Sequence, residues 1–285
     1  MASCELAGPA AIWHNSSVLK RLLLLLLIGT LMVAGFFTFR YYQHSKELKK
    51  QADITAKQIE NKIPPDYLII LVGDSMTEYI GNSTEMRQYL GEYYPGKTFD
   101  VYNYGFGSTN ILSIPYRLTQ WSNRDRPYQP ILDINDADLI ILESMGHNPL
   151  SQFPLEEGLR KQTQALEEIV KLIKERRPDT KIVFLTTISP NSKTYAHNVV
   201  ELSDENRQIW VKERVAYIKN HAKFAKDNNI PLIDVFTKSL DKNGDGNLTY
   251  IEDKNYIHPS PKGILLLQRE IADFIYNNHL LDDGK

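Results

Sequence analysis

The hydrophobic residues of this chain follow two patterns that alternate along most of its length. Short runs such as 68–72 are continuously apolar, which is typical of strands in a sheet covered on both faces. Longer segments such as 155–177 carry apolar residues every three or four positions, which indicates amphipathic helices. Strands are predicted at 67–72, 98–103, 138–143, 181–186 and 231–236, and helices at 83–94, 110–121, 155–177, 204–228 and 262–278.

This alternation of strands and helices predicts a parallel sheet between two layers of helices, a three-layer α/β/α fold. The alternating region, residues 64–285, is long enough to bury a substantial core, and it contains no internal repeat. In such a fold, ligands bind beyond the carboxyl ends of the strands. The residues that follow each predicted strand are therefore expected to meet at one edge of the sheet.

Four of the five predicted strands are followed by residues suited to ester chemistry. Ser75 follows the first strand in a Gly-Asp-Ser-Met turn, Gly107 and Asn148 lie in the turns after the second and third, and His258 follows the fifth beyond an insertion. A serine hydroxyl becomes a nucleophile when a histidine takes its proton, and the resulting oxyanion needs fixed N–H donors. We predict Ser75 as the nucleophile and His258 as the base. The predicted oxyanion donors are the backbone N–H groups of Ser75 and Gly107 and the side-chain amide of Asn148.

The motifs Gly-Asp-Ser-Met, Asn-x-Gly-x-Gly, Gly-x-Asn and His-Pro-Ser, in this order, resemble those of the SGNH (GDSL-like) hydrolase superfamily. The resemblance covers most of residues 66–278. It implies a flavodoxin-like sheet and esterase, lipase or deacetylase chemistry without an organic cofactor. Carried over by motif, it implies Ser75 as the nucleophile, His258 as the base, and Gly107 and Asn148 as oxyanion donors.

The chain departs from this resemblance at the residue that orients the histidine. The family usually has an aspartate three residues before the histidine, where this chain has Asn255. Asp253, five residues before His258, is the predicted third member of a triad if the backbone loops toward the imidazole. Alternatively, Asn255 or a carbonyl orients the ring and the enzyme works as a Ser–His dyad. An asparagine cannot stabilise imidazolium as a carboxylate does, so a dyad predicts slower chemistry.

Residues 241–252, between the last predicted strand and His258, match the pattern of a twelve-residue calcium loop. Gly246 stands at the sharp turn of that pattern. A bound ion would order the segment that carries His258, so we predict a structural Ca²⁺ in this loop. A polar turn rich in Asp, Asn and Gly is the alternative interpretation. The predicted oxygen ligands are Asp241, Asn243, Asp245, the carbonyl of Asn247 and bidentate Glu252.

The N-terminal region predicts a membrane attachment. Residues 22–39 carry no charge, and as a helix they would be about 27 Å long, close to the bilayer core of about 30 Å. We predict a leader at 1–21, a transmembrane signal anchor at 22–39 and a stalk at 40–63. Cleavage of a signal peptide and secretion is the alternative. Positive charges after the span favour a cytoplasmic domain, but the calcium-type loop suits calcium levels outside, so we predict an extracytoplasmic domain.

Composition narrows the classes of function. With 42% hydrophobic and 24% charged residues and a net charge of −2, the chain is unlike a disordered or polybasic nucleic-acid-binding protein. Cys4 is the only cysteine, which excludes a disulfide framework and a thiolate zinc site.

The sequence predicts a membrane-anchored serine hydrolase that removes an O-acyl group, chiefly O-acetyl, from an envelope or extracellular glycan or a small ester. An O-acyltransferase with the same nucleophile and a calcium-dependent binding protein with a degenerate site are the alternatives.

Overall fold

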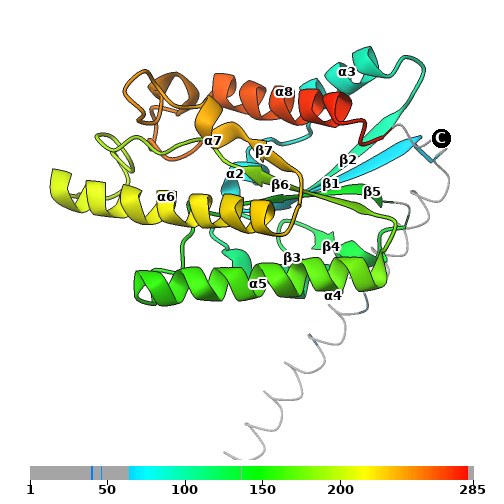
Figure 1. Cartoon of the computed structure of the whole chain (residues 1–285), viewed down its shortest axis with the longest axis horizontal. Helices are drawn as coiled ribbons and strands as arrows, with labels where there is room; N and C mark the ends of the chain where they lie inside the picture. Colours follow the sequence, from blue (N-terminus) through cyan, green and yellow to red (C-terminus); the bar gives the residue numbers. More distant parts are fainter. Residues whose placement is uncertain (1–39, 41–45, 47–63, 136, 282–285) are drawn as a thin grey trace, which may run out of the picture. The chain divides into compact units, whose positions relative to one another are not determined.

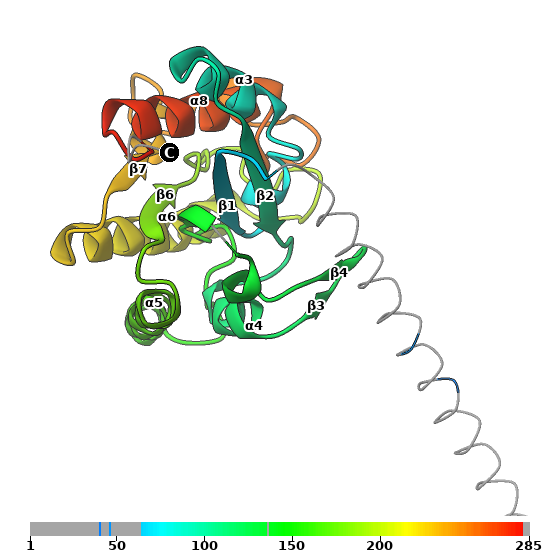
Figure 2. The same cartoon turned by 90° about the vertical axis from the view of Figure 1, so that its right-hand side faces the viewer.

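A five-stranded parallel sheet forms the centre of the compact unit that begins at Pro64 (Figures 1 and 2). The computed structural model describes residues 40, 46, 64–135 and 137–281. The predicted α/β sheet is confirmed, although residues 235 and 236 begin a helix instead of ending a strand. In sheet order the strands are β2 (Phe99–Gly105), β1 (Tyr67–Gly73), β5 (Ala137–Glu143), β6 (Lys181–Thr186) and β7 (Leu232–Asp234).

Helices cover both faces of the sheet (Figures 1 and 2). Residues of β1 alternate between two hydrophobic cores: Ile70 belongs to one, and Ile69 to the other. Because both faces are buried, the whole strand is apolar, as its continuous run of hydrophobic residues predicts. One layer contains α3 (Thr84–Tyr93) and α8 (Pro261–Asn277), and the other contains α4 (Ile114–Thr119), α5 (Leu155–Arg176) and α6 (Asp204–Asp227).

Several short elements connect this framework, and the sequence pattern did not predict them. The helix predicted at 110–121 is divided into a 3-10 turn, η1 (Ile111–Ser113), and α4, which has Pro115 in its first turn. Proline has no N–H to continue a preceding helix but fits a helix start. The other short elements are α2 (Ser75–Glu78), β3 (Ser122–Asn123), β4 (Pro127–Tyr128), η2 (Ile131–Asp133), α7 (Val235–Lys238) and η3 (Leu248–Tyr250).

The predicted membrane attachment falls outside most of the described structure. The leader at 1–21, the span at 22–39 and all but two residues of the stalk at 40–63 lie outside the described residues. Within the part of the chain that is described, no helix combines the length and apolar character needed to cross a bilayer. The anchor and the leader stay predictions.

Candidate active site

Ser75 is the first residue of α2 and follows the end of β1 after a tight turn. A Cβ built on Gly73 would lie 2.0 Å from Thr77 Oγ1, so the turn requires glycine. Asp74 caps α2 by accepting a hydrogen bond from the backbone N–H of Met76 (2.8 Å). The serine therefore stands at the carboxyl end of a central strand, where sites form in sheets of this type.

His258 reaches Ser75 from a position 183 residues further along the chain. Its Nε2 lies 2.9 Å from Ser75 Oγ, which is within hydrogen-bond reach. The imidazole stacks on the ring of Tyr79, with centroids 4.2 Å apart and planes 8° from parallel. Burial lowers the pKa of His258, although the charge of Glu252 opposes this. The ring is therefore uncharged at neutral pH and can accept a proton from the serine.

The other two predicted oxyanion donors, Gly107 and Asn148, lie at the same edge of the sheet as Ser75. A Cβ built on Gly107 would lie 3.5 Å from Ser75 Cβ, so this glycine passes directly beside the serine. Asn148 Nδ2 donates to Asp74 Oδ2 (2.7 Å), which ties its amide to the turn that carries Ser75. An amide nitrogen carries two hydrogens, so one remains for an oxyanion. The structure thus brings Ser75, His258, Gly107 and Asn148 together, while their catalytic roles stay predictions.

This arrangement occurs within a sequence region that matches a known family. Residues 71–264, more than half of the chain, match the sequence model of the GDSL-like Lipase/Acylhydrolase family. The chain belongs to this family. Membership establishes an ester-hydrolysing enzyme, as the sequence predicts. No significant match is found among curated proteins.

Solved structures of the same fold agree with membership of the GDSL-like family. The lipase/acylhydrolase from Enterococcus faecalis is 16% identical, with a TM-score of 0.50, and the match covers 74% of this chain and 96% of that chain. The acetyl xylan esterase AlAXEase is 18% identical, with a TM-score of 0.50, and the match covers 74% of this chain and 98% of that chain. At such low sequence identity, the similarity to these two structures establishes the fold of this chain alone.

A buried arginine supports the catalytic edge of this GDSL-like hydrolase. Arg117 donates to the carbonyls of Gly73 (2.7 Å) and Tyr104 (3.1 Å), which joins the ends of β1 and β2. It also donates to the hydroxyl groups of Thr109 and Ser113, beyond the turn that contains Gly107. The side chain is only 2% exposed, so these bonds replace its contacts with water. Arg117 thus fixes the turn that carries Ser75 and the turn that carries Gly107 relative to each other.

Glu143, at the end of β5, lies in the same buried layer. Its Oε1 accepts from Ser144 Oγ (2.7 Å) and from the backbone N–H of Met145 (2.9 Å). Burial and the neighbouring charge of Asp74 raise the pKa of Glu143 well above its ordinary value. The neutral acid of Glu143 is thereby favoured. Burial also raises the pKa of Asp74, whose Oδ2 accepts the hydrogen bond from Asn148.

The residues around the histidine differ from the predicted triad. Asp253 is exposed, and it forms no ion pair with His258 among the described residues. Asn255 Nδ2 lies 3.0 Å from His258 Nδ1, and the nearby carboxylate is Glu252, with Oε1 3.6 Å from Nδ1. The predicted approach of Asp253 is therefore not found, because the irregular segment turns its side chain to solvent. Glu252, predicted as a calcium ligand, stands at the imidazole, and this position was missed.

The calcium-type loop, 241–252, is held by its own hydrogen bonds. Asp241 Oδ1 accepts from the backbone N–H groups of Asn243 (2.8 Å) and Asp245 (3.0 Å). The Asp245 carboxylate accepts from both the N–H and the hydroxyl of Ser192 (2.9 and 2.7 Å), and Asn247 caps η3. Within the described residues, no three or more His, Cys, Asp and Glu side chains gather as a metal would require. The predicted ligand set also includes an asparagine side chain and a backbone carbonyl, and calcium binding stays a prediction.

A carboxylate from α2 accepts a hydrogen bond from one of the predicted oxyanion donors. Glu78 Oε2 accepts from the backbone N–H of Gly107 (3.0 Å), and Oε1 lies 3.9 Å from Arg124 Nη2. Glu78 is three residues after Ser75 on a short helix, so the two side chains share one face. Helical spacing could have identified this residue. An oxyanion can use the Gly107 donor only after the Glu78 carboxylate withdraws from it.

Replacing Glu78 with Ala is expected to raise kcat/KM for an aryl acetate by about three- to tenfold. The variant frees the Gly107 N–H from a competing hydrogen bond, and such a bond contributes about 0.5 to 1.5 kcal/mol. Initial rates at low substrate concentration measure the change, with Glu167→Ala on the exposed face of α5 as the matched control. A fall in kcat/KM would instead show that Glu78 supports the turn or the reaction.

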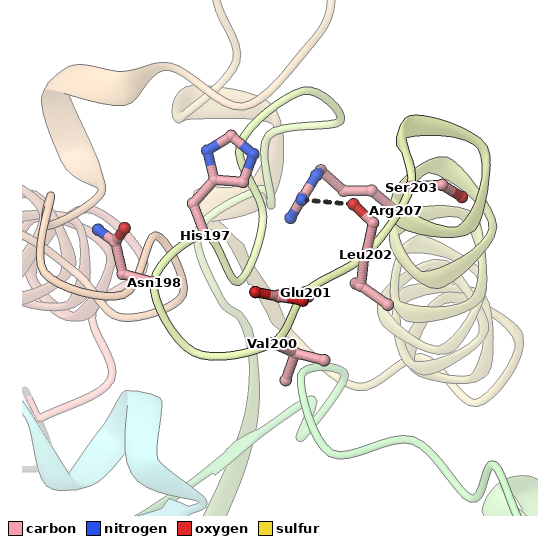
Figure 3. A pocket seen from close by; sticks show the side chains of 7 residues that line it. All are labelled: His197, Asn198, Val200, Glu201, Leu202, Ser203 and Arg207. Carbon is pink, nitrogen blue, oxygen red and sulfur yellow. Dashed lines mark hydrogen bonds between the residues drawn. The ribbon is translucent and has the colours of Figure 1, made fainter.

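A hollow of about 430 Å³ lies beside the segment that carries the histidine (Figure 3). His197 packs edge-on against Tyr256, and Asn198 donates to the carbonyl of Asp253 (3.4 Å). Neither Ser75 nor His258 lines the hollow, so it is separate from the reacting atoms. Its mixed lining suits a polar group and consists of His197, Asn198, Val200, Glu201, Leu202, Ser203 and Arg207.

Proposed function

We propose that this enzyme is a serine esterase that removes O-acyl groups, chiefly O-acetyl, from a glycan through an acyl-enzyme on Ser75. The observation that carries the proposal is the 2.9 Å contact between Ser75 Oγ and His258 Nε2. Gly107 and Asn148 add donors beside the serine. A nucleophile in contact with an uncharged base, next to amide donors, is the arrangement that acyl transfer requires.

The reaction follows from these positions. His258 Nε2 takes the Ser75 proton as Oγ attacks the ester carbonyl, and the oxyanion binds the N–H groups of Ser75, Gly107 and Asn148. The tetrahedral species expels the alcohol, which receives the proton from Nε2, and the acyl group stays on Ser75. A water molecule then gives a proton to Nε2 and attacks the acyl-enzyme, which releases the carboxylic acid and restores the serine.

Three observations support the substrate class. A protein with the same fold is an acetyl xylan esterase, and that activity suggests O-acetylated glycans as the class to test. The predicted anchor at 22–39 and the calcium-type loop would place the enzyme outside the cytoplasm, where envelope or extracellular glycans occur. The hollow of mixed lining next to the histidine segment offers room for a sugar (Figure 3).

Covalent trapping tests this proposal. Treatment with a fluorophosphonate is expected to add one phosphonyl group to the peptide that contains Ser75, because the probe reacts with a base-activated serine. Mass spectrometry of a protease digest identifies the residue, and acetate release from acetylated xylan and an aryl acetate measures turnover. Absence of both labelling and acetate release would refute the hydrolase and favour a binding protein. Acetyl transfer to an added deacetylated glycan, at the expense of acetate release, would instead identify an acyltransferase.

A further inference from the structure

The proposed reaction requires a group that accepts a hydrogen bond from the other ring nitrogen of His258, Nδ1. For Nε2 of His258 to take the Ser75 proton, Nδ1 must already carry a hydrogen, and a hydrogen-bond acceptor must select that tautomer. In a triad this acceptor is a carboxylate, which also stabilises the imidazolium. The residue at the usual position here is Asn255, whose Nδ2 lies 3.0 Å from His258 Nδ1.

Asn255 cannot be that acceptor, because three contacts determine the orientation of its amide. Its Oδ1 accepts from the backbone N–H groups of Ile257 (2.8 Å) and His258 (3.1 Å), while Nδ2 donates to Glu252 Oε1 (2.5 Å). Turning the amide over would set its nitrogen against two N–H donors and its oxygen against a carboxylate oxygen. The group facing Nδ1 is therefore an amide nitrogen, which donates hydrogen bonds and does not accept them.

Glu252 is the carboxylate that the backbone holds at the imidazole. Its Oε1 lies 3.6 Å from His258 Nδ1, and no other acidic residue in the described structure forms an ion-pair contact with this histidine. The Glu252 N–H donates to the His258 carbonyl (2.9 Å), and the Tyr79 hydroxyl donates to Oε1 (3.3 Å). The same Tyr79 stacks on the imidazole, so ring and carboxylate are positioned together.

We propose that Glu252 is the charge partner of His258, the carboxylate that accepts a hydrogen bond from the Nδ1–H group in place of the missing aspartate. This deepens the proposed hydrolase function and rests on it. When Nε2 takes the Ser75 proton, the Nδ1–H donates to Glu252 Oε1, and the two atoms close from 3.6 Å to about 2.8 Å. Glu252 takes no proton in this step and acts on the reaction only by positioning and stabilising the imidazolium.

Acid-to-amide changes at two neighbouring residues test this assignment. Glu252→Gln is expected to lower kcat for an aryl acetate by about 10²- to 10⁴-fold with little change in KM, because an amide does not compensate the imidazolium charge. Asp253→Asn removes the adjacent exposed carboxylate, and its loss is expected to be at least tenfold smaller. An equal or larger loss at Asp253 would overturn the proposal, as would a Glu252 variant within threefold of the parent.

Rescue separates this role from a merely structural one. Adding Asn255→Asp to Glu252→Gln places a carboxylate at the position 3.0 Å from Nδ1, so at least a tenfold recovery of kcat is expected. Thermal melting monitors the fold of each variant, and a folded double variant without recovery would overturn the proposal.

The loss at Glu252→Gln should persist in EDTA, and a loss confined to calcium-containing buffer would assign Glu252 to the metal instead. A parent enzyme that neither labels nor turns over would refute the hydrolase proposal itself.

Discussion

Replacing Ser75 with Ala is expected to lower kcat/KM for an aryl acetate by about 10⁴- to 10⁶-fold and to abolish fluorophosphonate labelling. The loss is large because Ser75 Oγ is the one hydroxyl in contact with His258 Nε2 among the described residues, and removing a serine nucleophile has effects of this size. Residual turnover would come from the oxyanion donors and binding alone.

The control for this variant is Ser151→Ala, which changes an exposed serine in the turn before α5. Its kcat/KM should match that of the parent enzyme. Both variants should melt within about 2 °C of the parent, because Oγ of the partly exposed Ser75 makes no contact that holds the core. Retention of more than a hundredth of the parent activity by a folded Ser75→Ala protein would show that another residue forms the acyl-enzyme.

The main features of the fold and the central pair of the site could be predicted from the sequence. The continuous apolar run of β1 is explained by burial on both faces, and the periodic apolar residues of α5 form its buried side. Ser75 and His258 are far apart in sequence, but parallel strands end at one edge, so their meeting follows from topology. For predicting which residues meet in the site, a position directly after a strand is therefore more informative than the distance between two residues along the chain.

The partner of the histidine could not be predicted, because it lies in a segment without periodicity. In a strand or helix, residue number determines the direction of a side chain. Between η3 and α8 the direction depends on single hydrogen bonds, such as those from Glu252 N to the His258 carbonyl and from Tyr256 N to the Glu252 carbonyl. These bonds direct Glu252 to the imidazole and leave Asp253 exposed, although the two residues are adjacent.

Replacing His258 with Ala is expected to lower kcat/KM by about 10⁴- to 10⁶-fold, because Ser75 then has no base. In the parent enzyme the acid limb of the pH profile reports protonation of this imidazole. Burial lowers the pKa of His258, while Glu252, Asp74 and Glu78 oppose the shift, so the base form persists below pH 6.5. The acid limb should therefore lie below about pH 6.5, the pH at which an ordinary histidine is half protonated, and activity should be retained at pH 6.5 itself.

The pH profile and a double variant together identify the base. If His258 takes the proton from Ser75, the two residues act as a unit, so Ser75→Ala with His258→Ala should be no less active than Ser75→Ala alone. The pH profile of the residual activity of His258→Ala should also lack the acid limb seen in the parent, because the titrating imidazole has been removed. An acid limb unchanged in His258→Ala, or losses that multiply in the double variant, would mean that His258 is not the base. His147 is a poor substitute, because it is buried and both of its ring nitrogens already have partners, the carbonyl of Ile188 (3.2 Å) and the hydroxyl of Tyr195 (3.3 Å).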